Sequence, residues 1–445
     1  MKKWASTTAG ISSASPQACC SLRVVSARHQ SPSVNMWRIA VASVALPVAC
    51  LALRDATGPT RPLAFGPDGT FQISILDDLH YGEAASSYGP IQDALTTKTI
   101  ANLLADEPQT DFVVINGDLI SRDNIFLDNT THYIDQLVQP ILDRNLTWAT
   151  LHGNHDPGYN RSVEAMLARE QRWPNSRTRS MVPDPERVGI TNYYLPIYPV
   201  DCPTGCGCAP ALLLWFFDSR SGFEYQKLGP DGKRIARPNW VDADVVDWFL
   251  AENQRIVTKF NKTIPSLSFV HIPFDAFSAV QDGPGIDPQR QPGINDMVVT
   301  GQAIGYCPDG VNNGTCAYGG QDIPFMKAVT STPGMLGLFT AHQHGDSWCY
   351  KWTADALPDY PVQPEGDGLN ICFGQRTGYG GNGNWERGSR QVLLRQNQLA
   401  LGELETWIRL ESGEVVGAVS LNGTYGQDIY PVSPNRETFC RECNK

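Results

Sequence analysis

Polar residues gather at the ends of five apolar runs, and most histidines of the chain lie among them. Of its eight histidines, five fall in these polar clusters and a sixth, His152, directly precedes one. Carboxylate, imidazole and amide groups brought together are typical ligands of zinc, manganese and iron. The pattern therefore indicates a metal centre. The five clusters are Asp77–His80, Asn116–Ile120, Gly153–Asp156, Val270–Phe274 and Ala341–His344.

Two of these clusters carry a pair of ligand-type residues separated by one position. The pairs are Asp78 with His80, and His342 with His344. Alternate residues of a regular strand share one face. An irregular turn after a strand can also aim such a pair at one point. Either geometry would let both side chains of a pair reach a shared site.

The runs that precede the clusters predict buried strands. They are short and rich in Val, Ile, Phe and Trp. Two segments between them, residues 132–146 and 241–256, carry an apolar stripe at helical spacing, with Leu250 on the second stripe and with Pro140 expected to kink or restart the first. Alternating strands and helices predict an α/β architecture, whose ligands sit beyond the carboxyl ends of the strands. The predicted strands cover residues 71–76, 112–116, 146–151, 211–217, 266–270 and 335–340.

The remaining segments predict how the chain is divided. Residues 66–433 are expected to form the main domain, with the polar motifs in 77–346 and further strands in 347–433, including a hairpin through Ser412 and Gly413. The Pro- and Gly-rich segments 175–210 and 282–322 are expected to be surface loops. Residues 434–445 would form a cysteine-containing tail.

The N-terminal region predicts entry into the secretory pathway. Residues 1–35 are expected to be a low-structure extension, and residues 36–56 a signal peptide or signal anchor. The apolar stretch from Ile39 to Leu53 is shorter than the roughly 20 residues of a membrane span. No stable span is therefore expected once the signal is cleaved, and a signal-anchored form is the alternative.

Sequons and cysteines point the same way. Nine of the twelve cysteines lie beyond the leader, and in an oxidising compartment they would form disulfides. Cys307–Cys316 and Cys440–Cys443 are the pairs expected from spacing. Six sequons predict glycosylation, at Asn129, Asn145, Asn160, Asn261, Asn313 and Asn422.

The overall charge restricts the partners. The net charge is −11, and no basic tract could hold a nucleic-acid backbone, so nucleic-acid binding is not expected. An acidic surface also repels polyanionic substrates weakly. Phosphate chemistry on this chain would need local positive charge, such as metal ions.

The ordered clusters resemble the calcineurin-like metallophosphoesterases. That family shows D-x-H, G-D, G-N-H-[DE], a lone His and G-H-x-H in this order. This chain matches every part, except that Ala341 replaces the glycine of the last motif, a position that supplies no ligand in the family. The stretches "HYGE" after the first motif and "FGQRTGYGG" after the last are similar to the secreted, purple-acid-phosphatase-like branch.

The resemblance implies a four-layer α/β/β/α sandwich with a two-metal site. Two divalent or trivalent ions (Fe, Zn or Mn) would be bound, and Asp118 would bridge them. His155 would act as general acid or donate to a phosphoryl oxygen, and Asp156 would orient it. The first metal would be held by Asp78, His80 and His344, and the second by Asn154, His271 and His342.

In one respect the chain departs from the purple enzymes. These enzymes have the pattern D-x-G in the first motif and carry a tyrosine three residues after the second aspartate. Here the corresponding residues are His80 and Ser121. With no tyrosinate ligand, no purple charge-transfer band is expected.

The resemblance implies hydrolysis of phosphate monoesters, on a small phosphorylated substrate or a phosphoprotein, by a hydroxide that bridges the metals. A secreted phosphodiesterase of the nucleotide or sphingomyelin type is the alternative. A non-catalytic phosphate-binding protein is a third hypothesis. Arg376 and Tyr379 are candidates for the substrate mouth, although a glycine-rich turn with a solvated arginine explains them equally well.

Overall fold

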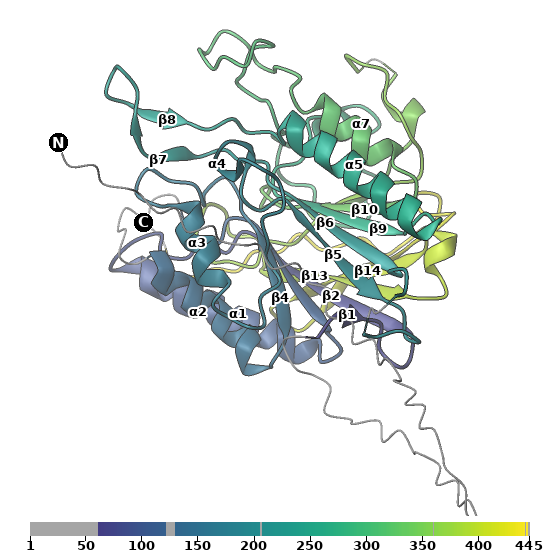
Figure 1. Ribbon diagram of the computed structural model, residues 1–445. Coiled ribbons are helices and arrows are strands. Elements are labelled where there is room, and N and C mark those ends of the chain that lie inside the picture. The colour runs from purple at the N-terminus through teal and green to yellow at the C-terminus, as the bar shows by residue number, and fades with distance from the viewer. Residues whose placement is uncertain (1–60, 122–129, 205–206, 359, 441, 444–445) are drawn as a thin grey trace, which may run out of the picture. The chain divides into compact units, whose positions relative to one another are not determined.

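Two β-sheets pack face to face, and helices cover the outer face of each (Figure 1). The computed structural model describes residues 61–121, 130–204, 207–358, 360–440 and 442–443. The predictions for residues 1–56, and those for Asn129 and Cys206, lie outside these residues. Among the described helices, none has the length and apolar character needed to cross a membrane.

The first sheet has seven strands, of which four neighbours run parallel: β6, β9, β10 and β12. Their parallel direction brings their carboxyl ends to one edge. In spatial order the strands are β1 (Leu63–Ala64), β5 (Tyr193–Tyr198), β6 (Leu212–Phe217), β9 (Ser266–Val270), β10 (Met335–Thr340), β12 (Asn370–Phe373) and β11 (Cys349–Lys351).

The second sheet has six strands, and β2, β3 and β4 run parallel within it. The C-terminal strands extend it by antiparallel pairing, beginning with β13 against β2. This confirms that the C-terminal strands complete the same sandwich. In spatial order the strands are β15 (Val415–Leu421), β14 (Leu404–Leu410), β13 (Gly388–Arg395), β2 (Thr70–Leu76), β3 (Phe112–Asn116) and β4 (Thr147–Leu151).

Side chains alternate between two buried clusters along each sheet. On β2, Ile73 and Ile75 belong to the cluster between the sheets, together with Phe216 of β6. Residues on the opposite face pack on helices: Val113 of β3 lies with the helices of one side, and Trp215 of β6 with those of the other. This sequence of helix, sheet, sheet and helix confirms the predicted four-layer α/β/β/α architecture.

The helices fall into two groups that cover opposite faces. Helices α1 (Tyr88–Asp106) and α2 (Thr130–Asp143) cover the six-stranded sheet, and α5 (Ala243–Phe260) and α7 (Ile323–Ser331) cover the seven-stranded one. The shorter elements are α3 (Val163–Glu170), α4 (Pro185–Val188), α6 (Ala276–Asp282), the 3-10 turns at Ala354–Ala356 and Leu399–Leu401, and the separate hairpin of β7 (Phe223–Leu228) and β8 (Arg234–Ala236).

Three local predictions need correction. Segment 175–210 is not only a surface loop, because it contains β5, whose Tyr193 is fully buried between the sheets. Helix α2 continues through Pro140 without a break, since the proline removes one backbone hydrogen bond while Leu137 and Ile141 stay packed in the core. Leu250 of α5 is 44% exposed, so it lies off the buried stripe.

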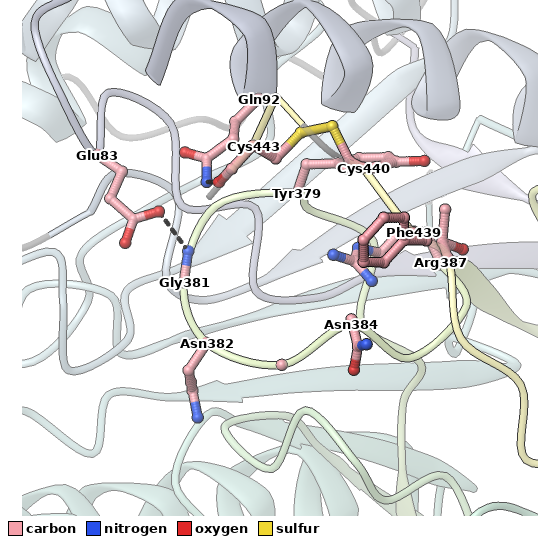
Figure 2. Close-up of a pocket in the computed structure, with 12 residues that line it drawn as sticks. Glu83, Gln92, Tyr379, Gly381, Asn382, Asn384, Arg387, Phe439, Cys440 and Cys443 are labelled. Atoms are coloured by element: carbon pink, nitrogen blue, oxygen red, sulfur yellow. Dashed lines mark hydrogen bonds between the residues drawn. A yellow bond between two sulfur atoms is a disulfide. The ribbon is translucent and has the colours of Figure 1, made fainter. Parts of the chain in front are cut away.

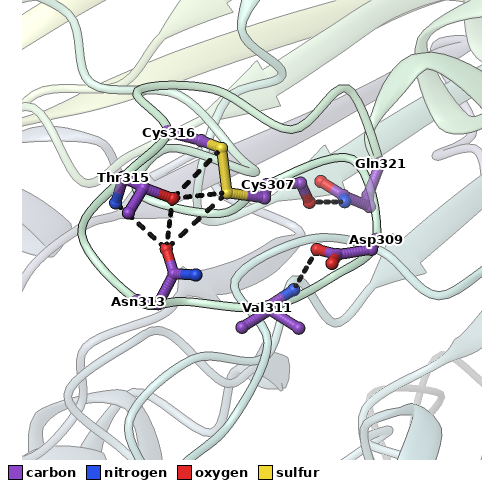
Figure 3. Close-up of a disulfide and its surroundings, with 7 residues drawn as sticks. All are labelled: Cys307, Asp309, Val311, Asn313, Thr315, Cys316 and Gln321. Atoms are coloured by element: carbon purple, nitrogen blue, oxygen red, sulfur yellow. Dashed lines mark hydrogen bonds between the residues drawn. A yellow bond between two sulfur atoms is a disulfide. The ribbon is translucent and has the colours of Figure 1, made fainter.

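Disulfides close four loops of the described chain. Cys307–Cys316 (Figure 3) and Cys440–Cys443 pair as predicted. Two further bridges were not predicted, Cys202–Cys208 and the cross-strand pair Cys349–Cys372, which joins β11 to β12. The disulfides agree with an oxidising compartment.

Five sequons lie in the described chain. Asn145, Asn261 and Asn313 are exposed, and Asn160 and Asn422 are half-buried. In Figure 3, the side chain of Asn313 accepts the Thr315 amide across the loop closed by Cys307–Cys316. Exposure at the first three positions is compatible with glycosylation.

Candidate metal centre

The residues predicted as metal ligands come from the ends of five strands, drawn from both sheets. Strands β2, β3 and β4 lead into motifs of the six-stranded sheet, and β9 and β10 into those of the other. Six of the seven predicted ligands are buried, and His342 is half-buried. The seven ligands are Asp78, His80, Asp118, Asn154, His271, His342 and His344.

Four of these residues adopt a left-handed backbone. The φ angles are 52° at Asp78, 50° at His80, 51° at Asp118 and 71° at His342. Left-handed backbone is uncommon away from glycine and costs about 1–3 kcal/mol per residue where it is strained. The D-x-H pair thus lies in an irregular turn after β2, one of the two geometries expected for it.

One group of donors gathers around Asp78, His80 and His344. One donor atom from each lies within 4.8 Å of the others. The two Nε2 atoms of His80 and His344 are 3.2 Å apart, and His344 Nε2 lies 3.7 Å from Asp78 Oδ1. These are the three residues predicted to hold the first metal.

A second group gathers around Asp118, His271 and His342, again with donors within 4.8 Å. Asn154 joins it, because its Oδ1 lies 3.0 Å from His271 Nε2. Asp118 Oδ2 lies 3.3 Å from His271 Nε2 and 3.6 Å from His80 Nε2. Asp118 therefore stands between the two groups, as a bridging ligand would.

Backbone carbonyls orient two of the imidazoles. His271 Nδ1 donates to the Asn116 carbonyl, and His344 Nδ1 donates to that of Asn382, each at 2.8 Å. Such a bond fixes the tautomer and leaves the Nε2 lone pair for a metal. Asn382 was not predicted from the sequence, since no motif reports a carbonyl contact.

Burial and neighbouring charges prepare the donors for a cation. Burial, reinforced by His155, holds the pKa of His80 well below its usual value. Burial and His271 lower the pKa of His342 to about 3. Burial opposes ionisation of Asp118, but His271 and His155 outweigh it and keep its pKa well below the usual range. Neutral imidazoles at His80 and His342 beside ionised Asp118 are the protonation states that metal binding requires. At His271, burial is outweighed by Asp118, which raises the pKa to about 10, so this imidazole must release a proton when an ion binds.

The donor set fits two metal ions. Two neutral imidazole nitrogens that face each other at 3.2 Å can share only one proton, whereas a cation between them satisfies both lone pairs. Nitrogen and oxygen donors without thiolate suit zinc, manganese or iron.

His155 lies at the edge of these groups. Its ring packs edge-on against that of His80, with centroids 4.6 Å apart, and its amide donates to Asp118 Oδ1 at 2.7 Å. Like His342, it is half-buried, so its ring is closer to solvent than the rings of the buried ligands.

Asp156 has a structural role that was not predicted. Its Oδ1 accepts the amide of Ile120 at 3.1 Å, and its Oδ2 accepts that of Gly153 at 2.7 Å. These bonds tie the loop after β3 to the loop after β4. Asp156 therefore fixes the backbone around Asp118.

Arg376 supports the centre from beneath a loop. It is 1% exposed, and its guanidinium donates to the carbonyls of Gly380, Asn382 and Gly383. Asn382 is the residue whose carbonyl holds His344. This corrects the expectation that Arg376 lines the substrate mouth.

Tyr379 does line a cavity, of about 480 Å³, between this loop and the C-terminal disulfide Cys440–Cys443 (Figure 2). Its hydroxyl donates to Glu411 at 2.8 Å. In the same view Glu83 accepts the amide of Gly381, which lies directly against the rings of His80 and His344. The cavity is thus separated from the metal ligands by a single loop.

Comparison with known proteins agrees with this geometry. Residues 75–269 match the family model described as calcineurin-like phosphoesterase. Among curated relatives, a protein of Arabidopsis thaliana named probable inactive purple acid phosphatase 14 is 24% identical, covering 83% of this chain and 89% of its own. Phosphatase DCR2 of Saccharomyces cerevisiae is also 24% identical, over 79% of this chain and 57% of its own.

Solved structures give weaker likenesses. A dimetal phosphatase from Danio rerio is 12% identical with a TM-score of 0.46, covering 79% of this chain and 98% of its own. Purple acid phosphatase PPD1 from yellow lupin is 12% identical with a TM-score of 0.37, covering 81% of this chain and 55% of its own.

Proposed function

We propose that this chain, whose residues 75–269 match the family model described as calcineurin-like phosphoesterase, hydrolyses phosphate monoesters with two bound metal ions. The observation that carries the proposal is the position of Asp118 between two buried donor groups. A single structural metal would need only one such group.

The donors divide naturally between two ions, of iron, zinc or manganese. Asp118 would contact both. Two ions in such a site withdraw charge from phosphoryl oxygens and lower the pKa of water held between them. Asp78, His80 and His344 would hold one ion, and Asn154, His271 and His342 the other.

His155 supplies the protein's own acid. A half-buried imidazole at the edge of the site can reach a bound ester and donate a proton to its leaving oxygen. The bond from its amide to Asp118 ties its backbone to the centre. The substrate would be a small phosphorylated molecule or a phosphoprotein, met outside the cell or in the secretory pathway, as the disulfides support.

Hydrolysis of p-nitrophenyl phosphate, compared with bis-p-nitrophenyl phosphate, tests the proposal. The protein would be loaded with Mn, Zn or Fe and assayed beside Asp118→Asn. We expect the monoester to be hydrolysed faster than the diester, and we expect Asp118→Asn to hydrolyse neither. Faster turnover of the diester would instead identify a phosphodiesterase.

The name of one relative, probable inactive purple acid phosphatase 14, favours a second hypothesis, a phosphate-binding protein without turnover. The complete donor set and the presence of His155 argue against it. If the protein binds phosphate but hydrolyses neither ester with any of the three metals, this second hypothesis is correct.

A further inference from the structure

A cavity of about 620 Å³ adjoins the loop that carries Asn154 and His155. It is bounded by Pro157 and Arg161 of that loop and by the base of the β7–β8 hairpin, which projects from the sandwich (Figure 1). A Cβ added to Gly222 of that base would lie 2.2 Å from the Pro157 carbonyl oxygen and 3.1 Å from that of Asn154. The hairpin base therefore touches the backbone of a metal-ligand residue.

Two buried arginines of the cavity wall lack full partners. Arg237 is 8% exposed, and within the described chain its side chain makes no hydrogen bond or ion pair. Arg220 is 2% exposed. Its Nε and Nη1 are bonded, Nη1 to Asp242 at 2.9 Å, while its Nη2 has no partner within that same described region.

These two guanidinium groups also act on each other. Burial lowers the pKa of Arg220, and the charge of Arg237 acts in the same direction. Asp242 offsets these effects only in part, so the pKa falls to about 10. Arg220 already pairs with Asp242 at 2.9 Å, whereas Arg237 forms no ion pair within the described chain. A desolvated cation is stabilised by a nearby anion, so an anion in the cavity would lower the energetic cost of both charges.

Three of the four carboxylates that line the cavity are paired with cations. Asp184 pairs with Arg187 at 2.9 Å, and Lys227 pairs with Glu186 at 2.7 Å and Glu224 at 3.0 Å. The fourth lining carboxylate, exposed Glu164, has no cation partner among the described residues and accepts Ser162 Oγ at 2.7 Å. The positive charge of Arg237 in the wall is likewise not taken up by an ion pair within the described chain. Guanidinium groups are the side chains best suited to phosphate and carboxylate.

We propose that this cavity is a second anion site, which binds a phosphate or carboxylate group of the substrate other than the phosphate that is cleaved. Its position against the Asn154 loop places that group beside the metal centre. The role in substrate choice rests on the proposed phosphatase function, whereas the binding of an anion does not.

Calorimetric titration with sulfate tests the binding itself. Chelator-treated protein is used, so that sulfate cannot bind to metal ions in the centre. One sulfate is expected to bind, and Arg237→Gln should weaken it at least tenfold. Arg234→Gln is the matched control, an exposed arginine three residues away that does not line the cavity, and should change affinity less than twofold.

Arg237→Lys keeps the charge and should recover part of the affinity. Melting curves establish that each variant is folded. If sulfate fails to bind, or binds equally to the folded Arg237→Gln protein, the anion site is wrong whatever the enzyme does.

Kinetics on alkanediol bisphosphates of two to eight carbons, against the matching monophosphates, test the role in substrate choice. The wild-type protein should hydrolyse bisphosphates of one chain length fastest. Arg237→Gln should abolish that preference, while the rates on the monophosphates should stay unchanged. An equal preference in both proteins would overturn this role. If sulfate binds as expected but no ester is hydrolysed, the phosphatase proposal fails and the anion site stands.

Discussion

His155 lies at the edge of both donor groups, half-buried, with its ring edge-on to that of His80 and its amide bonded to Asp118. We expect His155→Ala to lower kcat on p-nitrophenyl phosphate by about 10²–10⁴-fold, the usual contribution of a general acid. Metal content should stay at the wild-type value, because all seven predicted ligands remain.

Steady-state kinetics and elemental analysis measure the two quantities. Exposed His132 provides the control, since His132→Ala removes an imidazole far along the chain from every motif. If His155→Ala loses a metal ion, His155 is a metal ligand. If the variant keeps the wild-type kcat, His155 is not the general acid.

Ser121 governs the colour of an iron-loaded protein. The position where purple enzymes carry a tyrosine holds a buried serine here, and the donor groups contain only histidine and aspartate besides Asn154. Without a tyrosinate ligand we expect no absorption maximum in the green for the iron form. A visible spectrum of the reconstituted protein decides this, and a band there would require a phenolate ligand.

At this scale the ligands could be predicted, because their types and spacing carry the chemistry directly. The roles of Asp156 and Arg376 could not, since both act on backbone atoms. Asp156 accepts two amides and Arg376 donates to three carbonyls. A motif records which side chain is present but not which loop backbone lies beside it.

The loops after β3 and β4 approach so closely that only glycine fits at position 153. A Cβ there would lie 2.3 Å from Asp118 Oδ1 and 2.5 Å from the Asp118 amide nitrogen. Gly153→Ala should therefore displace the bridging carboxylate, reducing the metal content and lowering activity at least 100-fold, in line with the loss of a positioned group.

Gly158, five residues along the same loop, supplies the matched control. Its added Cβ would meet nothing closer than 3.6 Å, which is ordinary contact. Gly158→Ala should keep both metals and most of the activity. Equal behaviour of the two variants would show that the loop, and not its contact with Asp118, is what the centre needs.

Helix α1 is tied to the first motif by Asp93, whose Oδ1 accepts the Gly82 amide at 2.9 Å. Burial raises the pKa of Asp93 to about 6, so the folded state holds a proton that the unfolded state, near 3.8, has released. The contribution of Asp93 to stability is therefore complete below about pH 4 and is lost as the pH rises to about 6.

Asp93→Asn keeps an acceptor for Gly82 and removes this titration. Relative to wild type, it should gain up to about 3 kcal/mol in the free energy of unfolding at pH 8, and little or nothing at pH 4. Urea unfolding at the two pH values measures the difference. A gain that is the same at both would exclude the titration of Asp93 as its cause.

Elements with a strong period were predictable and the others were not. The strands before each motif are continuous apolar runs and were predicted to within about one residue. Helix α1 was not predicted, because Thr96 and Thr99 are buried on its packed face and weaken the apolar stripe. Strand β5 was not predicted, because Pro196 and the prolines around it are typical of a loop.

Across the whole molecule, the metal ligands join the two sheets. Asp78, Asp118 and Asn154 follow strands of the six-stranded sheet, while His271 and His342 follow strands of the other. Elsewhere the sheets meet mainly through apolar side chains, with a few hydrogen bonds between them, such as that from Tyr193 of β5 to the Thr150 carbonyl of β4. Ions bound here would act as a cross-link at one edge of that interface.

Metal removal should therefore lower the stability of the whole domain. A ligand that binds only the folded state stabilises it by about 2.7 kcal/mol when its free concentration is 100 times Kd. We expect the melting temperature to fall after chelation and to rise again with the logarithm of added Mn or Zn. Asp118→Asn, which removes the shared ligand, should respond much less than wild type.

The part of the chain that loses stability after chelation shows whether the ions cross-link the two sheets or stabilise the whole fold evenly. Without ions, Asp78 and Asp118 remain as buried carboxylates among facing imidazoles, at the ends of strands from both sheets. Hydrogen exchange should therefore accelerate after chelation at the carboxyl ends of β3 and β9 together. Acceleration confined to one sheet, or spread evenly over the chain, would mean that the ions do not hold the sheets to each other.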